Sequence, residues 1–118
     1  MANKYFYNGK LVRTSEHIYT HAVLNEKGEL VGCRPSYDKA HNIITSKIAE
    51  ANSFVKEYKS LLKAISEGRK TYEFKVGNRR IIAPVRYTDV NEINGWIDGL
   101  YERIATISSW TIVELECR

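Results

Sequence analysis

The segment Ser36–Glu67, SYDKAHNIITSKIAEANSFVKEYKSLLKAISE, decides the fold of this 118-residue chain. Its apolar residues recur at steps of three and four, which is the spacing of one face of an α-helix. Ser36 is the expected N-cap, and Gly68 is the expected residue just beyond the helix end. Such a helix would be roughly 48 Å long, whereas a compact domain of this size is about 35 Å across. We therefore expect the helix either to break, near Thr45-Ser46 or Asn52-Ser53, or to overhang and form the spine of an oligomer.

The chain before this segment predicts a small antiparallel meander that opens with a hairpin. Asn8-Gly9 is a strong signal for a type I′ turn, with Tyr5–Tyr7 leading in and Lys10–Thr14 returning. The register that this turn sets would place Lys4 opposite Arg13. Both faces of the hairpin carry large apolar residues, so both are expected to be covered.

Alternating and helical apolar spacings continue through the rest of the chain. The expected elements are strands over His17–Leu24 and Glu29–Cys33, the long helix, a hairpin over Thr71–Ala83 turning at Gly77-Asn78, a helix capped by Thr88, and a terminal strand over Trp110–Cys117. The order ββββ-α-ββ-α-β predicts an α+β fold, with one long and one shorter helix on one face of an antiparallel sheet of hairpins. Residues 1–118 are expected to form a single domain.

Composition narrows the class of protein. Apolar residues make up 43% of the chain and charged residues 27%, which is typical of a soluble globular protein. The net charge of +4 is compatible with a polyanionic partner or simply with solubility. We expect a cytoplasmic protein, because no apolar run is long enough to span a membrane and the N-terminus does not resemble a signal peptide. Cys33 and Cys117 are expected to be free thiols, with a disulfide between them as the alternative.

No pattern in the sequence predicts catalysis. His17 and His21 are four residues apart, but on a strand this spacing separates them by about 13 Å, too far to share a metal. A nucleophile motif and a phosphate-binding loop are both missing. We therefore expect a protein that is not an enzyme and that needs neither a metal nor a cofactor.

Like-charged residues across the hairpins favour a binding function. Lys75 should lie opposite Arg80, and Lys4 opposite Arg13, which is destabilising by a few tenths of a kcal/mol per pair. Such pairs can be solvated strand edges that resist aggregation. They can also hold an anion, and phosphate is the natural candidate because arginine presents a planar fork that matches phosphate oxygens.

Amides and aromatic rings follow these cations in the sequence, as recognition of a nucleotide would require. Tyr87 or Trp96 can stack on a base, although Trp96 lies on the apolar stripe of its helix and also fits the core. The candidate ligand-binding residues are Arg13, Lys75, Asn78, Arg79, Arg80, Arg86, Tyr87 and Asn91. A homo-oligomer, a dimer or larger, would bring them together.

The block Tyr5–Ser15, YFYNGKLVRTS, followed by Tyr19–Val23, YTHAV, resembles the opening of small accessory proteins of bacteriophages. In its size and its mixture of small sheet and long helices, the chain is similar to the first Thoeris anti-defence family. This resemblance implies an oligomeric phage protein that acts in the infected bacterial host. It would sequester, without cleaving it and without a cofactor, a cyclic ADP-ribose signal made by a TIR-domain defence enzyme.

Two other classes of function compete with this interpretation. A phage inhibitor can act by direct protein contact on a bacterial defence complex, as anti-CRISPR proteins do. A mimic of nucleic acid should be strongly acidic, whereas this chain is basic, so only a basic inhibitor of this class remains. A small nucleic-acid-binding module is disfavoured because no Lys/Arg-rich stripe or known fingerprint is evident and the aromatic residues fit core faces.

Overall fold

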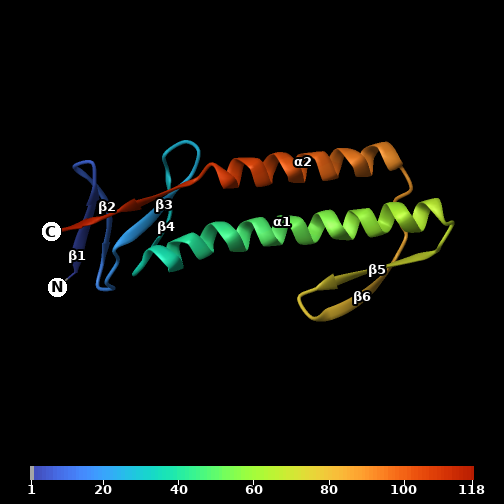
Figure 1. Cartoon of the computed structure of the whole chain (residues 1–118), viewed down its shortest axis with the longest axis horizontal. Helices are drawn as coiled ribbons and strands as arrows, with labels where there is room; N and C mark the ends of the chain where they lie inside the picture. The colour runs from blue at the N-terminus through green and yellow to red at the C-terminus, as the bar shows by residue number, and fades with distance from the viewer. Residues whose placement is uncertain (1) are drawn as a thin grey trace. The chain divides into compact units, whose positions relative to one another are not determined.

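The computed structural model describes residues 2–118 and confirms the predicted α+β layout (Figure 1). The strands are β1 (Asn3–Tyr7), β2 (Lys10–Ser15), β3 (His21–Leu24), β4 (Leu30–Arg34), β5 (Thr71–Val76), β6 (Arg79–Pro84), β7 (Thr111–Glu114) and β8 (Glu116–Cys117), and the helices are α1 (Tyr37–Ser66) and α2 (Val90–Ser108). Within the described residues the strands form three small antiparallel sheets, ordered β2-β1-β8, β4-β3-β7 and β5-β6, rather than one.

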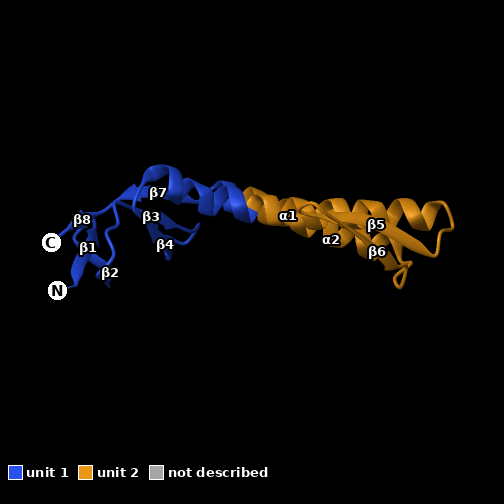
Figure 2. Ribbon diagram, turned by 90° about the horizontal axis from the view of Figure 1, so that it is seen from below, with its two compact units in different colours: residues 1–47, 106–118 blue, residues 48–105 orange. Residues whose placement is uncertain are grey.

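The chain divides into two compact units (Figure 2). The first unit contains residues 2–47 and 106–118, and the second contains residues 48–105. No helix within residues 2–118 is both long and apolar enough to cross a lipid bilayer.

The long helix α1 forms as predicted, over 30 residues without either of the expected breaks. Its first turn is capped by Ser36, whose Oγ accepts a hydrogen bond from the backbone N–H of Lys39 at 3.2 Å. Just beyond its end, Gly68 has a φ of 68°, and its N–H donates to the carbonyl oxygen of Ile65 at 3.1 Å. A residue with a side chain would be strained in this left-handed conformation, which explains the glycine.

The first hairpin keeps its predicted turn, with positive φ at Asn8 and Gly9, but its register is different. A bulge between Tyr5 and Phe6 shifts the pairing by one residue, so that Tyr5 lies opposite Arg13. The predicted pairing of Lys4 with Arg13 is therefore wrong, because a bulge adds one residue to one strand of a pair.

The hydroxyl of Tyr5 explains why β3 begins later than predicted. Tyr5 is only 1% exposed, and its hydroxyl donates to the carbonyl oxygen of His17 at 2.7 Å and accepts from the N–H of Tyr19 at 3.1 Å. These backbone groups contact a side chain instead of a neighbouring strand. The predicted strand over His17–Leu24 therefore begins only at His21.

The predicted C-terminal strand is interrupted at Leu115 and becomes two strands. Before the interruption β7 pairs with β3, and after it β8 pairs with β1. The N–H of Leu115 donates to the carbonyl oxygen of Thr20 at 2.9 Å, so the interruption is itself hydrogen-bonded. The C-terminal segment thus contributes a strand to each of the two sheets of the first unit.

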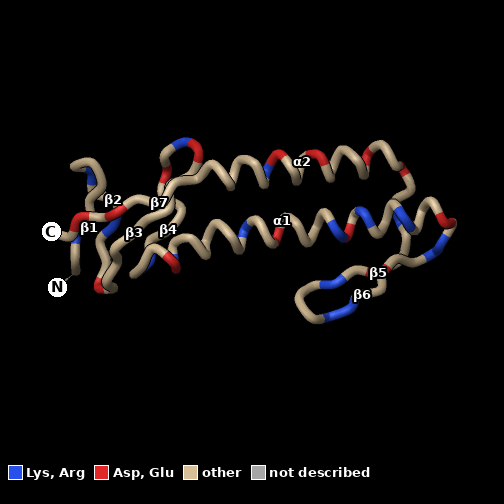
Figure 3. Tube along the Cα trace, in the orientation of Figure 1, with Lys and Arg blue, Asp and Glu red and all other residues tan. Residues whose placement is uncertain are grey.

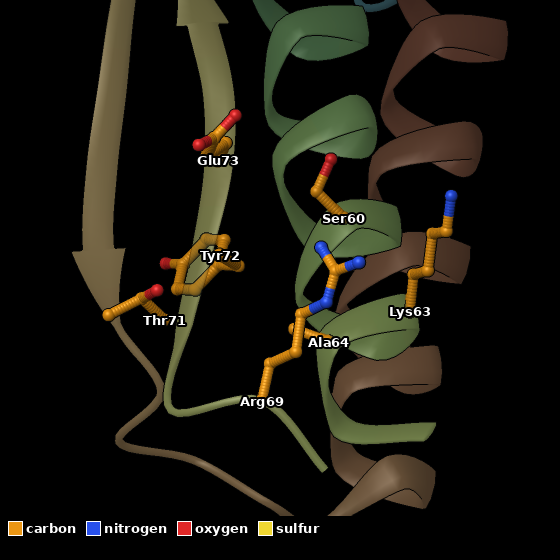
Figure 4. A pocket seen from close by; sticks show the side chains of 7 residues that line it. All are labelled: Ser60, Lys63, Ala64, Arg69, Thr71, Tyr72 and Glu73. Atoms are coloured by element: carbon orange, nitrogen blue, oxygen red, sulfur yellow. The ribbon is translucent and has the colours of Figure 1, made fainter. Parts of the chain in front are cut away.

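The second unit packs the later part of α1, the earlier part of α2 and the β5–β6 hairpin around one apolar cluster. In Figures 1 and 4, α1 lies between the hairpin and α2. The buried members of the cluster are Val55, Leu61, Ile93 and Ile97. Tyr72 and Trp96 are among the half-buried residues that pack against it, so Trp96 is a core residue. The hairpin has its predicted register, with Phe74 opposite Ile81.

The N-cap of α2 is Asp89, one residue later than predicted. Its Oδ1 accepts a hydrogen bond from the N–H of Glu92 at 3.1 Å, and its carbonyl oxygen accepts from the N–H of Ile93 at 3.1 Å. Aspartate is a better cap than threonine, and its negative charge complements the helix dipole. The prediction of Thr88 as the cap is therefore wrong.

Candidate functional site

The predicted pair Lys75 and Arg80 lies directly across the β5–β6 hairpin, as expected. The carboxylate of Glu73, a residue outside the predicted set, adds a negative charge beside this pair of cations. The Nε of Arg80 donates to Oε2 of Glu73 at 2.9 Å, and a terminal guanidinium nitrogen bonds the same oxygen. The repulsion between Lys75 and Arg80 is thus offset by a neighbouring negative charge, and Arg80 is already engaged.

The other predicted residues of the second unit lie at opposite ends of the hairpin. Asn78 and Arg79 are exposed at its turn, whereas Arg86 follows the far end of β6. Arg86 lies seven positions after Arg79, which corresponds to about 23 Å of extended chain. One small ligand cannot contact both ends of this strand.

Tyr87 and Asn91 belong to the start of α2. The ring of Tyr87 packs edge-on against Trp96, with ring centres 5.5 Å apart, and Asn91 is exposed in the first helical turn. Tyr87 is 60% exposed. Part of its surface is thus committed to an aromatic contact within the chain.

Arg13 lies in the first unit. Its guanidinium carbon is 5.3 Å from the ring centre of Tyr19, a cation–π contact. It is also close to Cys33, a buried free thiol. Burial raises the pKa of the Cys33 thiol, and the positive charge of Arg13 opposes that rise. The guanidinium of Arg13 thus already has partners within the first unit.

A groove between α1 and β5 brings together a different set of cations, which the sequence reasoning missed. One hollow of about 640 Å³ is lined by Ser53, Lys56, Lys59, Ser60, Glu73, Phe74, Lys75 and Gly77. A second, of about 230 Å³, is lined by Ser60, Lys63, Ala64, Arg69, Thr71, Tyr72 and Glu73 (Figure 4). Because the two hollows share Ser60 and Glu73, we treat them as one site and call it the basic groove.

The helical side of the basic groove follows from the spacing of polar residues along α1. Ser53, Lys56, Ser60 and Lys63 recur at steps of three and four, so they share one helix face. This polar stripe was the signal in the sequence that could have revealed the site. The apolar stripe of the same helix, by contrast, predicts only the core.

The strand side of the basic groove supplies aromatic rings and a carboxylate. Tyr72 and Phe74 stack with ring centres 5.6 Å apart and an angle of 24° between their planes. The Tyr72 hydroxyl lies 3.5 Å from Oε1 of Glu57. Burial, and then the Glu57 carboxylate, raise the pKa of Tyr72. The hydroxyl therefore stays protonated at neutral pH.

Cations dominate the charge of this lining. Among residues 2–118, the five cationic side chains Lys56, Lys59, Lys63, Arg69 and Lys75 line the basic groove, together with the carboxylate of Glu73. Figure 3 shows Lys and Arg recurring along the later part of α1 and on the β5–β6 hairpin. Cations gathered along a groove with low-dielectric walls raise the local concentration of anions.

Arg69 and Lys59 each have a further contact. Arg69 comes from the loop after α1, and Figure 4 shows its side chain running from that loop alongside α1. Its Nε forms an exposed ion pair with Glu67 at 2.7 Å. The ammonium of Lys59 lies 5.6 Å from the ring centre of Tyr101. Both pairings are at the surface, where such contacts contribute about 1 kcal/mol or less and compete weakly with an anion.

Chemically, the basic groove offers ammonium and guanidinium donors, hydroxyls, stacked rings and one carboxylate. This set suits an anion that carries oxygens and a planar ring. Of the eight predicted site residues, Lys75 alone lines it. In the described part of the chain, no three metal-binding side chains gather in one place.

The chain was compared with known proteins in three ways. No protein-family model matches the sequence, no curated protein matches it significantly, and no solved structure matches its fold significantly.

Proposed function

We propose that this protein binds a small anionic ligand of nucleotide type in the basic groove and releases it unchanged. The observation that carries this proposal is the gathering of five cationic side chains from α1, β5 and the loop between them around one groove. Five like charges in a small volume repel one another. A bound anion relieves that repulsion.

The dimensions of the basic groove favour a ligand of nucleotide size over a single phosphate ion. Its two hollows, of about 640 and 230 Å³, compare with the roughly 300–1,000 Å³ that is typical of small-molecule pockets. Lys56 and Lys63 are seven residues apart on α1, which is about 10.5 Å along the helix axis. A ligand with more than one phosphate can therefore contact cations at both ends.

A hollow in the first unit, in contrast, does not suit an anion. It has a volume of about 480 Å³ and lies between the turns of the β1–β2 and β3–β4 hairpins. Lys10 is the one charged side chain in its lining, which otherwise includes Leu11, Leu24 and Leu30. This comparison supports the basic groove as the anion site.

The resemblance of the opening block to the first Thoeris anti-defence family makes the proposal more specific. On that basis the ligand is a cyclic ADP-ribose signal, which carries two phosphates, two riboses and an adenine. The protein then acts as a phage counter-defence sponge in the cytoplasm of the infected host, as a homo-oligomer and without catalysis. The stacked Tyr72 and Phe74 rings provide a surface on which the adenine can pack, a contact worth about 1–3 kcal/mol.

The test is recovery of intact ligand. The purified protein is incubated with a cyclic ADP-ribose isomer, freed of unbound ligand, and heated to release what it holds. Recovery of the unchanged compound supports sequestration, a converted product would make the protein an enzyme, and no retention would overturn the proposal. Gel filtration with light scattering before heating measures the subunit number.

Charge-reversed variants locate the binding. The double variant Lys56→Glu/Lys75→Glu should weaken binding at least about tenfold, or 1.4 kcal/mol, because it places two carboxylates in the groove. The double variant Lys10→Glu/Lys27→Glu, at two exposed positions of the first unit, has the same total charge change and should bind like the wild type. Equal losses in both variants would show that net charge, and not the basic groove, attracts the ligand. Preferential binding of a short oligonucleotide over the cyclic compound would favour a nucleic-acid-binding module instead.

A further inference from the structure

One carboxylate lies among the cations of the basic groove, and attraction of an anion does not explain it. Glu73 belongs to the lining of both hollows, so it occupies the middle of the groove. In Figure 4 it extends from β5 at the level of Ser60 on α1. A negative charge at this place weakens the binding of any bare anion.

The carboxylate of Glu73 is fixed in a way that leaves one oxygen free. Both contacts from Arg80 go to Oε2, and Oε1 accepts no hydrogen bond from any residue between 2 and 118. The side chain of Glu73 is 48% exposed, so a ligand can reach it. An ionised carboxylate only accepts hydrogen bonds, so a ligand group that displaces water from the free oxygen must be a hydrogen-bond donor.

Phosphate oxygens of a nucleotide cannot supply that donor, whereas sugar hydroxyls can. A carboxylate that accepts hydrogen bonds from ribose hydroxyls is common in nucleotide-binding sites. It binds the two hydroxyls and repels a phosphate in the same position. A site with a buried or oriented polar acceptor also rejects an analogue that lacks the matching donor.

We propose that Glu73 is a specificity residue of the basic groove, which makes it select anions that carry ribose hydroxyls over anions of equal charge that lack them. This inference rests on the proposed anion binding and adds the class of ligand. Arg80 acts as a positioning residue, since it holds Oε2 and leaves Oε1 for the ligand.

A charge-matched pair of probes, ADP and 2′,3′-dideoxy-ADP, tests the inference by titration calorimetry. They differ only in the ribose hydroxyls, and the wild-type protein should bind ADP about tenfold more tightly. Glu73→Gln should reduce this preference to less than about threefold and should bind the dideoxy compound more tightly than the wild type does, because a negative charge is gone. Glu67→Gln removes a neighbouring carboxylate that does not line the groove, and it should retain the wild-type preference.

The possible results distinguish ribose selection by Glu73 from anion binding by the basic groove. If the wild type binds both probes equally, or if Glu73→Gln keeps the tenfold preference, Glu73 does not read the ribose and the inference fails while anion binding stands. If the wild type binds neither probe, nor pyrophosphate, the basic groove is not an anion site and both fail. Circular dichroism of each variant checks its fold, and the wild-type comparison of the two probes is decisive even without a variant.

Discussion

Replacing Asp89 by alanine should destabilise the second unit by about 1.5 kcal/mol. The hydrogen bond from the N–H of Glu92 to Asp89 Oδ1 is lost, and removing such a cap costs about 1 kcal/mol. The negative charge at the start of α2 is lost as well, which costs about 0.3–1 kcal/mol. Asp89→Asn keeps the acceptor and loses only the charge, so it should cost about 0.5 kcal/mol. Thr88→Ala should change the stability by less than about 0.5 kcal/mol.

Urea unfolding followed by the fluorescence of Trp96 measures these differences. Trp96 packs against the core of the second unit, and a Trp110→Phe background removes the only other tryptophan. The four proteins, the background and its three variants, should then unfold in the order Asp89→Ala, Asp89→Asn, and last Thr88→Ala together with the background. A larger loss for Thr88→Ala than for Asp89→Ala would refute the reasoning, because it would place the helix start one residue earlier.

Two further predictions concern titratable groups. Cys117 is exposed and Cys33 is buried, so a thiol reagent at neutral pH should modify one thiol of the native protein rapidly and the second only after unfolding; equal rates for both would contradict the burial of Cys33. Burial and Glu57 raise the pKa of Tyr72, so folding favours the protonated form of its hydroxyl. This contribution to stability is complete below pH 10, and it is lost as the pH rises through the pKa of the folded state. Tyr72→Phe should therefore lose less stability than the wild type between pH 9 and 12, and identical losses would show that Tyr72 does not contribute.

The elements that sequence reasoning located well are those specified by local interactions. The helix α1 carries an unbroken apolar stripe and ends with Gly68 in a left-handed conformation, and both features depend only on neighbouring residues. The β5–β6 hairpin has the predicted register because its turn and its alternation agree.

The first unit was harder to predict because contacts between residues far apart in sequence decide its details. The bulge that moves Arg13 opposite Tyr5, and the late start of β3, accompany the burial of Tyr5 and its hydroxyl contacts with a loop more than ten residues away. No local spacing in the sequence encodes such contacts. The interruption at Leu115 likewise depends on distant contacts, because the terminal segment pairs first with β3 in one sheet and then with β1 in another.

The candidate site was only partly predictable for a related reason. Reasoning along single hairpins identified Lys75 and its opposite residue Arg80, but the basic groove combines β5 with the polar stripe of α1. Which face of a helix meets which strand is set by packing of the core, here around Val55 and Leu61. The apolar stripe of α1 determines that packing. The polar residues beside the stripe face β5 as a consequence.

The central claim, that anions bind between α1 and β5, is tested most directly by a nuclear magnetic resonance titration of the labelled protein with ADP. The account predicts that amide shifts concentrate in residues 53–63 and 69–75 and that they saturate together with one dissociation constant. Saturating shifts centred on Arg13, or on residues 86–91, with the basic groove unchanged, would contradict it.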